Sequence, residues 1–525
     1  MRRPFTLAFV VAMVASSGGI ALDITAPERR CAALAVLRLP DTTVLSADEV
    51  SGSSFSPSGA APLTGLPRFC RVTATTTPAV HFEVWLPDAE WNGKFQGVGN
   101  GGMAGTISYG AMAAALKRGY AVASTDTGHV SKGSFDATWA LRRPDLIADF
   151  GHRSLHVTTL NGQKITGAFY HRRPRHSYYV GCSKGGQQGL MEAQRYPEDY
   201  DGIIAGDPAN NWTRFYAGGH LWYWLATTRD PASYIPARKI PLLTDAVNAA
   251  CDALDGVRDG VLEDPRACRF DPATLACAPG QDADTCFTAP QVRAVRDIWR
   301  GAHTSSGELV YPGLVPGGEA GRGGWTAWTT GTGPSTGTHA QAADGFFKNM
   351  VFDNPDWDYR SFNYDTDVNV AVRKVGPLLD AVDPDLRPLR RRGAKLLVYH
   401  GWSDPDISPL NTIRYYEDVV AAQGKRSRNE GLEATRAFFR LFMVPGMQHC
   451  GDGPGVSQFD MLTALEDWVE KGSPPATIPA SRPLEGGAVR TRPLCLYPDV
   501  ASYTGRGSTD DAANFICKQP VSSRQ

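Results

Sequence analysis

The 525-residue sequence lacks an excess of charge of either sign: 53 Lys and Arg stand against 54 Asp and Glu, a formal net charge of -1. A chain so close to neutrality has no electrostatic footprint for nucleic acid or for an anionic membrane surface. Beyond its first residues it also lacks an apolar run long enough to predict a membrane span. We therefore expect neither a nucleic-acid partner nor a membrane partner. The length suits two lobes, or one enlarged domain with an insertion.

Cys-x-x-Cys pairs are also missing, although the chain holds 10 cysteines. Their absence disfavours a zinc site, and an even number of cysteines favours disulfides in an oxidising compartment. Short separations favour local pairing because closing a short loop costs little entropy. Assigning the neighbours first leaves Cys182 with Cys450, for which two buried free thiols are the alternative. The expected pairs are Cys31–Cys70, Cys182–Cys450, Cys251–Cys268, Cys277–Cys286 and Cys495–Cys517.

Residues 1–21 have the features of a signal peptide. A basic start precedes an apolar stretch from Phe5 to Ala15, and small residues suit a cleavage site before Leu22. The apolar stretch is too short to span a bilayer comfortably, so a signal peptide fits better than an anchor. The sequence therefore predicts a secreted or periplasmic protein.

Strand and helix patterns alternate in two separated parts of the chain, after an irregular lead-in over residues 23–78. Strands are expected at 81–86, 94–98, 120–124, 176–180, 203–205, 394–399 and 437–444, and helices at 111–118, 155–170, 185–195, 410–423 and 459–471. Such alternation is typical of an α/β fold, a mostly parallel sheet covered on both faces. Residues 210–390 lack this rhythm and hold four cysteines. We interpret them as a lid inserted into one core formed by residues 22–209 and 391–525.

The pattern Gly-x-Ser-x-Gly occurs at Gly181-Cys182-Ser183-Lys184-Gly185, between an apolar strand and a helix. A nucleophile elbow of an α/β-hydrolase core belongs at this position. The two glycines remove side chains that would clash in the tight turn, and the helix N-terminus favours developing negative charge. An ordinary glycine-rich turn is the alternative.

Serine needs a base, and in this fold the acid and the histidine follow it in that order, each in a loop after a later strand. His449 follows the strand that ends near residue 444, and Asp404 follows the preceding strand, with Asp406 as a nearby alternative. We predict the triad Ser183–Asp404–His449. A disulfide from Cys182 to Cys450 would fasten the nucleophile turn to the histidine loop and preorganise the pair.

An oxyanion requires two hydrogen-bond donors. The amide of Lys184 follows the nucleophile, and the glycine-rich segment 99–105 offers the amide of Gly102. Phosphate binding is the rival role for such a loop, but no Lys-Ser/Thr follows it as a P-loop requires. No organic cofactor is expected.

Three carboxylates lie close together at Asp252, Asp255 and Asp259. Close like charges repel unless a cation neutralises them, and hard oxygen ligands suit Ca²⁺. The carbonyls of Val257 and Val261 could complete the ligand set. The spacing is not that of an EF-hand, and a solvated acidic turn is the alternative.

Together these motifs resemble the tannase and feruloyl esterase family. The most specific part is Cys182-Ser183 with His449-Cys450, and Asp404 as the acid; the Gly-Asn-Gly-Gly loop, the acidic stretch and the segments 459–462 and 491–495 are also similar. The resemblance implies an α/β-hydrolase core, a lid bearing calcium, and hydrolysis of esters of aromatic carboxylic acids. It also supports the five cysteine pairings.

The lid supplies the candidates for the acyl pocket. Aromatic side chains that could stack on a substrate ring are Trp325, Trp328, Phe346 and Phe347. In this family the mono(2-hydroxyethyl) terephthalate hydrolase holds the free carboxylate with a lid arginine, and the resemblance places Ala342 there. Without that partner a terephthalate monoester should bind poorly.

We therefore expect feruloyl (hydroxycinnamoyl) or galloyl esters as substrates, free or attached to a plant polysaccharide or polyphenol. Activity like that of the terephthalate-monoester hydrolase is the alternative within the family. A carbohydrate-binding protein with a relict elbow is the alternative of another class.

Overall fold

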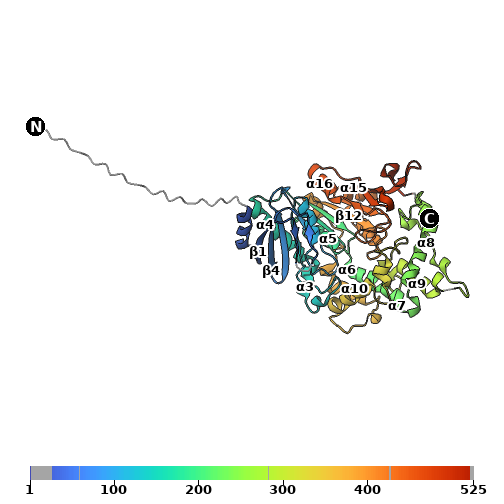
Figure 1. The fold of residues 1–525 in the computed structure, drawn as a ribbon. Helices are drawn as coiled ribbons and strands as arrows, with labels where there is room; N and C mark the ends of the chain where they lie inside the picture. Colours follow the sequence, from blue (N-terminus) through green and yellow to red (C-terminus); the bar gives the residue numbers. More distant parts are fainter. Residues whose placement is uncertain (2–26, 58–59, 282, 425–426, 521–525) are drawn as a thin grey trace.

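The computed structural model describes Met1 and residues 27–57, 60–281, 283–424 and 427–520, so the predicted signal peptide lies almost entirely outside the described residues. A nine-stranded sheet forms the centre (Figure 1). Its order is β1 (Thr42–Val50), β4 (Phe69–Thr76), β5 (Val80–Pro87), β7 (Ala121–Thr125), β6 (Lys94–Val98), β8 (His176–Cys182), β9 (Gly202–Gly206), β12 (Lys395–Gly401) and β13 (Phe439–Val444). The six strands from β7 to β13 pair in parallel, and β1, β4 and β5 form an antiparallel extension.

Helices cover both faces of the parallel strands. On one face lie α4 (Ser154–Tyr170), α5 (Lys184–Arg195) and α14 (Pro409–Gln423); on the other lie α2 (Tyr109–Lys117) and α16 (Met461–Lys471). Successive strand residues point to opposite faces, so Tyr178 packs in one apolar cluster and Tyr179 in the other. Burial on both faces explains why these strands are continuous apolar runs. The predicted α/β class is confirmed.

Residues 210–390 lie in the chain between β9 and β12 and contribute no strand to the nine-stranded sheet. Their main elements are α6 (Trp212–Phe215), α7 (Trp222–Thr228), α8 (Ile240–Cys251), α9 (Ala289–Arg300), α10 (Thr338–Phe346) and the hairpin of β10 (Gly301–His303) and β11 (Leu309–Pro312). Figure 1 shows α6, α7, α9 and α10 grouped at one side of the sheet. Apolar side chains such as Tyr223, Leu243 and Val295 form a separate cluster here.

The expectation of an irregular lead-in over residues 23–78 is wrong. This segment contains α1 (Pro27–Ala33), β1 and β4, and the disulfide Cys31–Cys70 fastens α1 to β4. β1 has the sequence TTVLSADEV, and none of its residues is fully buried. A solvated edge strand needs no apolar run, which is why its sequence resembles a loop.

All five predicted disulfides are present, including Cys182–Cys450, so the alternative of two free thiols is wrong. Such a set is typical of proteins from oxidising compartments. Within the described ranges, every helix is too short or too polar to cross a membrane.

Candidate active site

The elbow lies where β8 ends at Cys182 and α5 begins at Lys184. Ser183 has φ 64° and ψ -120°, a strained conformation for a residue with a side chain. A Cβ added to Gly181 would lie 2.6 Å from the carbonyl oxygen of Gly185, and one added to Gly99 would lie 2.7 Å from the Gly185 Cα. The close approach of three backbone segments therefore requires these glycines.

The glycine-rich loop after β6 is anchored on the helix that follows the nucleophile. The amide of Asn100 donates to Oε1 of Gln188 (3.0 Å), and Nε2 of Gln188 donates to Oδ1 of Asn100 (3.0 Å). Gly102 has φ 54°, and a Cβ there would lie 2.2 Å from the Ser134 carbonyl oxygen. The anchor holds Asn100, two positions before Gly102, against the helix that begins at Lys184; Gly102 and Lys184 are the two residues predicted to supply the oxyanion donors.

Asp404 and His449 lie on loops after the neighbouring parallel strands β12 and β13. Nδ1 of His449 donates to Oδ2 of Asp404 at 2.8 Å. Oδ1 of Asp404 accepts the amides of Asp406 (2.8 Å) and Ile407 (3.0 Å), which fix the carboxylate. Because the strands are parallel, their carboxyl ends meet at the sheet edge where Ser183 also lies.

Asp207, which the sequence analysis missed, ties three of these loops together. It lies one residue after β9 and is completely buried. Its Oδ1 accepts the amide of Gly401 (2.8 Å), and its Oδ2 accepts the amide of Cys450 (2.7 Å). The Cys182–Cys450 disulfide closes the arrangement with Cα atoms 6.0 Å apart. The sequence feature that could have identified Asp207 is an acidic residue directly after a buried strand.

Charge around His449 comes from both sides of its ring. Burial lowers its pKa, but the charges of Asp404, Asp406 and Asp207 outweigh burial and raise the pKa of His449 to about 10. Oδ2 of Asp406 lies 3.6 Å from Nε2, the nitrogen opposite to the one that binds Asp404. Asp404 thus occupies the position of an orienting acid, and Asp406 does not.

Trp328 packs its ring on His449. Among the described residues, the other three predicted aromatic side chains do not. Trp328 belongs to the π-helical segment η11 (Thr326–Thr330), and its ring centroid is 5.1 Å from that of His449, with the ring planes at 78°. Phe346 packs on Tyr216 with centroids 4.6 Å apart. Trp325 and Phe347 are buried in apolar clusters, and Phe347 packs against Phe362.

The acidic stretch follows α8 and is held by backbone amides. Asp255 accepts the amides of Val257 (2.9 Å) and Glu263 (3.1 Å), and Asp252 accepts that of Gly260 (3.1 Å). Burial raises the pKa of Asp255 to about 6, and the charges of the two neighbouring aspartates act in the same direction. The stretch is thus a partly buried concentration of carboxyl groups.

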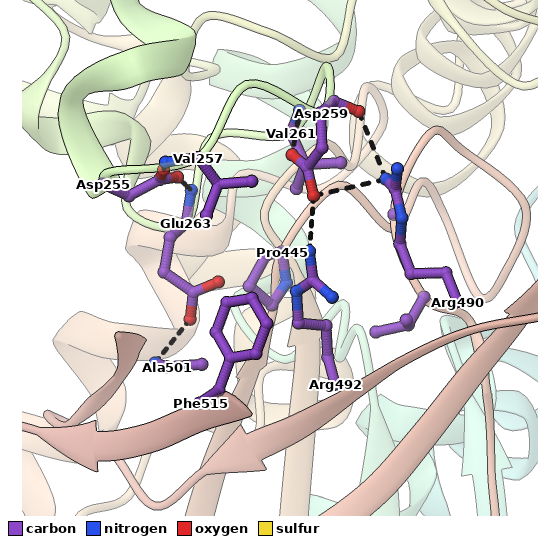
Figure 2. A pocket seen from close by; sticks show the side chains of 12 residues that line it. Asp255, Val257, Asp259, Val261, Glu263, Pro445, Arg490, Arg492, Ala501 and Phe515 are labelled. Atoms are coloured by element: carbon purple, nitrogen blue, oxygen red, sulfur yellow. Dashed lines mark hydrogen bonds and ion pairs between the residues drawn. The ribbon is translucent and has the colours of Figure 1, made fainter. Parts of the chain in front are cut away.

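Two arginines of the C-terminal strand β16 (Val489–Cys495) reach the same stretch, which sequence reasoning missed. Figure 2 shows Arg490 and Arg492 converging on Asp259, with Oδ2 at 3.3 Å and 2.6 Å. Glu263 points away toward the amide of Ala501 (2.7 Å) on β17 (Val500–Tyr503). Contacts between segments so distant in sequence leave no local signal.

The parallel sheet, the elbow at Ser183 and the His449–Asp404 pair at one sheet edge define an α/β hydrolase. The family model described as tannase and feruloyl esterase matches residues 64–518, and the chain belongs to that family.

Three similar proteins agree with this assignment. An uncharacterised esterase of Xanthomonas campestris is 42% identical, with 95% of this chain and 93% of the relative covered. The mono(2-hydroxyethyl) terephthalate hydrolase of Piscinibacter sakaiensis is 34% identical over 84% of this chain and 82% of its own. The crystal structure of feruloyl esterase B from Aspergillus oryzae superposes with a TM-score of 0.85 at 28% identity, covering 94% of this chain and 100% of the other. The protein is a carboxylic ester hydrolase.

Proposed function

We propose that this esterase cleaves esters of aromatic carboxylic acids through a triad of Ser183, His449 and Asp404. The observation that carries the proposal is the 2.8 Å bond between His449 and Asp404, fastened beside the Ser183 elbow by the Cys182–Cys450 disulfide. A His–Asp pair tied covalently to the elbow disfavours the alternative of a carbohydrate-binding protein with a relict elbow.

The mechanism is a two-step acyl transfer. In its neutral form, whose share grows as the pH rises towards the raised pKa of this group, His449 takes the proton of Ser183 on Nε2 as the serine hydroxyl oxygen attacks the ester carbonyl. Asp404 holds the ring and stabilises the imidazolium. The amides of Lys184 and Gly102 bind the oxyanion. His449 then gives the proton to the leaving alcohol, and water, activated by the same base, hydrolyses the acyl-enzyme to the free acid.

The acyl group we propose is feruloyl (hydroxycinnamoyl) or galloyl, with the alcohol free or part of a plant polysaccharide or polyphenol. Trp328 next to His449 offers an aromatic surface at the reacting carbonyl. Residues 340–346 contain no arginine, and Ala342 is completely buried on α10. A terephthalate monoester would find no bidentate partner there.

The test is Ser183→Ala assayed on methyl ferulate, methyl gallate and mono(2-hydroxyethyl) terephthalate. Loss of roughly 10⁴-fold or more in kcat is expected, with an unchanged melting temperature. A fluorophosphonate probe should label the wild-type protein at Ser183. Undiminished turnover in the folded variant, or no labelling, would overturn the assignment.

We also propose that Ca²⁺ binds the acidic stretch through Asp252, Asp255 and Asp259 and the carbonyls of Val257 and Val261. The donor set fits in kind: three carboxylates on one turn, largely removed from water, with two adjacent carbonyls. Arg490 and Arg492 neutralise Asp259 in part, and Asp252 and Asp255 are left for a cation. Chelation with EGTA should lower the melting temperature and added Ca²⁺ should restore it, because an ion bound to the folded state alone stabilises it. Asp252→Asn should abolish this response, and a wild-type protein indifferent to EGTA would contradict the site.

We further propose export through residues 1–21, supported by the five disulfides. Mass spectrometry of the mature protein should place its N-terminus at Leu22, and an intact N-terminus would contradict cleavage.

A further inference from the structure

Beside the proposed triad lies a cluster of two histidines and one carboxylate. His220 comes from the π-helical segment η4 (Tyr216–Leu221), His339 from α10, and Asp406 from the loop after β12. Their exposed fractions are 1%, 0% and 3%. Nε2 of His220 lies 2.8 Å from Oδ1 of Asp406, and Nε2 of His339 lies 3.4 Å from the same oxygen. One ligand atom from each residue lies within 4.8 Å of the other two.

In the described part of the chain, three of the four ring nitrogens of these histidines lack a hydrogen bond; the exception is Nε2 of His220, which bonds to Asp406. Neither ring nitrogen of His339 makes one with any described residue, and Nδ1 of His220 also has no hydrogen-bond partner there. Buried polar atoms without partners are costly and uncommon, and a missing ion or water is a standard reason for them. The lid supplies the two imidazoles and the core supplies the carboxylate, so a bound group would join the two parts of the molecule.

We propose that His220, His339 and Asp406 bind a divalent transition metal, with Zn²⁺ as the ion they suit best, and that the bound ion inhibits the esterase. Two imidazole nitrogens and one carboxylate oxygen are a common zinc set, and three protein ligands leave a fourth position for water. Imidazole disfavours Ca²⁺ and Mg²⁺, which prefer oxygen ligands, so this site differs in kind from the acidic stretch.

Inhibition follows from the position of Asp406. Its second oxygen lies 3.6 Å from Nε2 of His449, the nitrogen that must take and return the proton in the proposed reaction. A cation on Asp406 cancels the negative charge at this edge of the ring and adds positive charge near the imidazolium of the transition state. At a pH where the ring of His449 is neutral with and without the ion, the expected consequence is a lower kcat with little change in KM. The predicted inhibition rests on the proposed function, whereas the predicted metal binding does not.

Binding is tested without activity by titrating the calcium-saturated, full-length mature protein with Co²⁺ and recording visible absorption. Wild type should bind one Co²⁺ with ligand-field bands, and Zn²⁺ should displace it. His339→Leu should lose the bands at an unchanged melting temperature. The matched control is His171→Asn: it removes an exposed imidazole, and asparagine tolerates the φ of 55° there. If His339→Leu misfolds, Asp406→Asn provides the same test at constant volume.

Inhibition is then measured with methyl ferulate. Zn²⁺ should lower kcat at least 10-fold in wild type and in His171→Asn, reversibly on adding a chelator with Ca²⁺ in excess, and should leave His339→Leu nearly unaffected. Two results would overturn the proposal: no saturable Co²⁺ absorption in the folded wild type, or equal Zn²⁺ inhibition of wild type and His339→Leu. If Ser183→Ala shows that this serine is not the nucleophile, the Co²⁺ titration still decides the metal site.

Discussion

The core and the lid place their side chains at the site by different means. Ser183, Asp404 and His449 come from the ends of parallel strands, whose spacing the sheet hydrogen bonds fix. Trp328 and His220 come from π-helical segments, and three of the four such segments in the described residues lie in 210–390. A π-turn redirects side chains at the expense of regular hydrogen bonding. The comparison teaches that the proposed triad depends on the regular sheet, whereas the proposed aromatic contact of Trp328 and the proposed metal ligand His220 depend on irregular helices.

The largest expected effect comes from breaking the hydrogen bond between His449 and Asp404. Asp404→Asn should lower kcat by about 10⁴, because an amide favours the wrong tautomer of His449. Single-turnover assays and thermal melts on the purified variant would check this. Asp406→Asn is the matched control, since it lies at the other ring nitrogen. A larger loss of kcat in Asp406→Asn than in Asp404→Asn would reverse the assignment of the acid.

A second comparison sets a core disulfide against a lid disulfide. The double variant Cys182→Ser with Cys450→Ser should lose up to about 10²-fold in kcat/KM, because the elbow and the histidine loop can then separate by a fraction of an ångström to one ångström. Cys277→Ser with Cys286→Ser removes a bridge over only 9 positions of the lid and should leave kcat/KM unchanged. Equal losses of kcat/KM in both double variants would show that the Cys182–Cys450 disulfide acts through global stability.

A third prediction separates two lid aromatics. Trp328→Ala should lower kcat/KM by about 10-fold, the value of one well-placed aromatic contact. Phe347→Ala should instead destabilise folding by about 3–5 kcal/mol, with activity per folded molecule preserved, because Phe347 is buried among Phe352, Trp357 and Phe362. Denaturant unfolding and steady-state kinetics on both variants distinguish these outcomes. Loss of activity in folded Phe347→Ala would instead support a role for that residue in the substrate pocket.

The smallest expected effect is a gain. Ala342→Arg should raise the ratio of kcat/KM for mono(2-hydroxyethyl) terephthalate over that for methyl ferulate by a few-fold, through a new bond to the carboxylate. The gain is limited because Ala342 is completely buried and a larger side chain strains its surroundings. Ala342→Met, of similar length without charge, is the control. The same ratio in both variants would show that this position does not face the acid end of the substrate.

Most local features were predictable, whereas most contacts between segments distant in sequence were not. The elbow could be recognised because its glycines, strand and helix are contiguous in sequence. The five disulfides followed from spacing and elimination. In contrast, β1 was missed because an exposed edge strand has no apolar pattern. Asp207 was missed because its partners Gly401 and Cys450 lie 194 and 243 positions away.

The sequence by itself located the elbow and predicted the pairing of the cysteines and the order of the proposed serine, acid and histidine, because each depends on residue type and position along the chain. Only the tertiary structure shows which nitrogen of His449 each of Asp404 and Asp406 faces, and this geometry is what favours Asp404 as the proposed acid. It also brought His220 and His339 from the lid to Asp406 of the core. Such a cluster exists only after the insertion packs on the sheet, because burial and distance are properties of the folded chain.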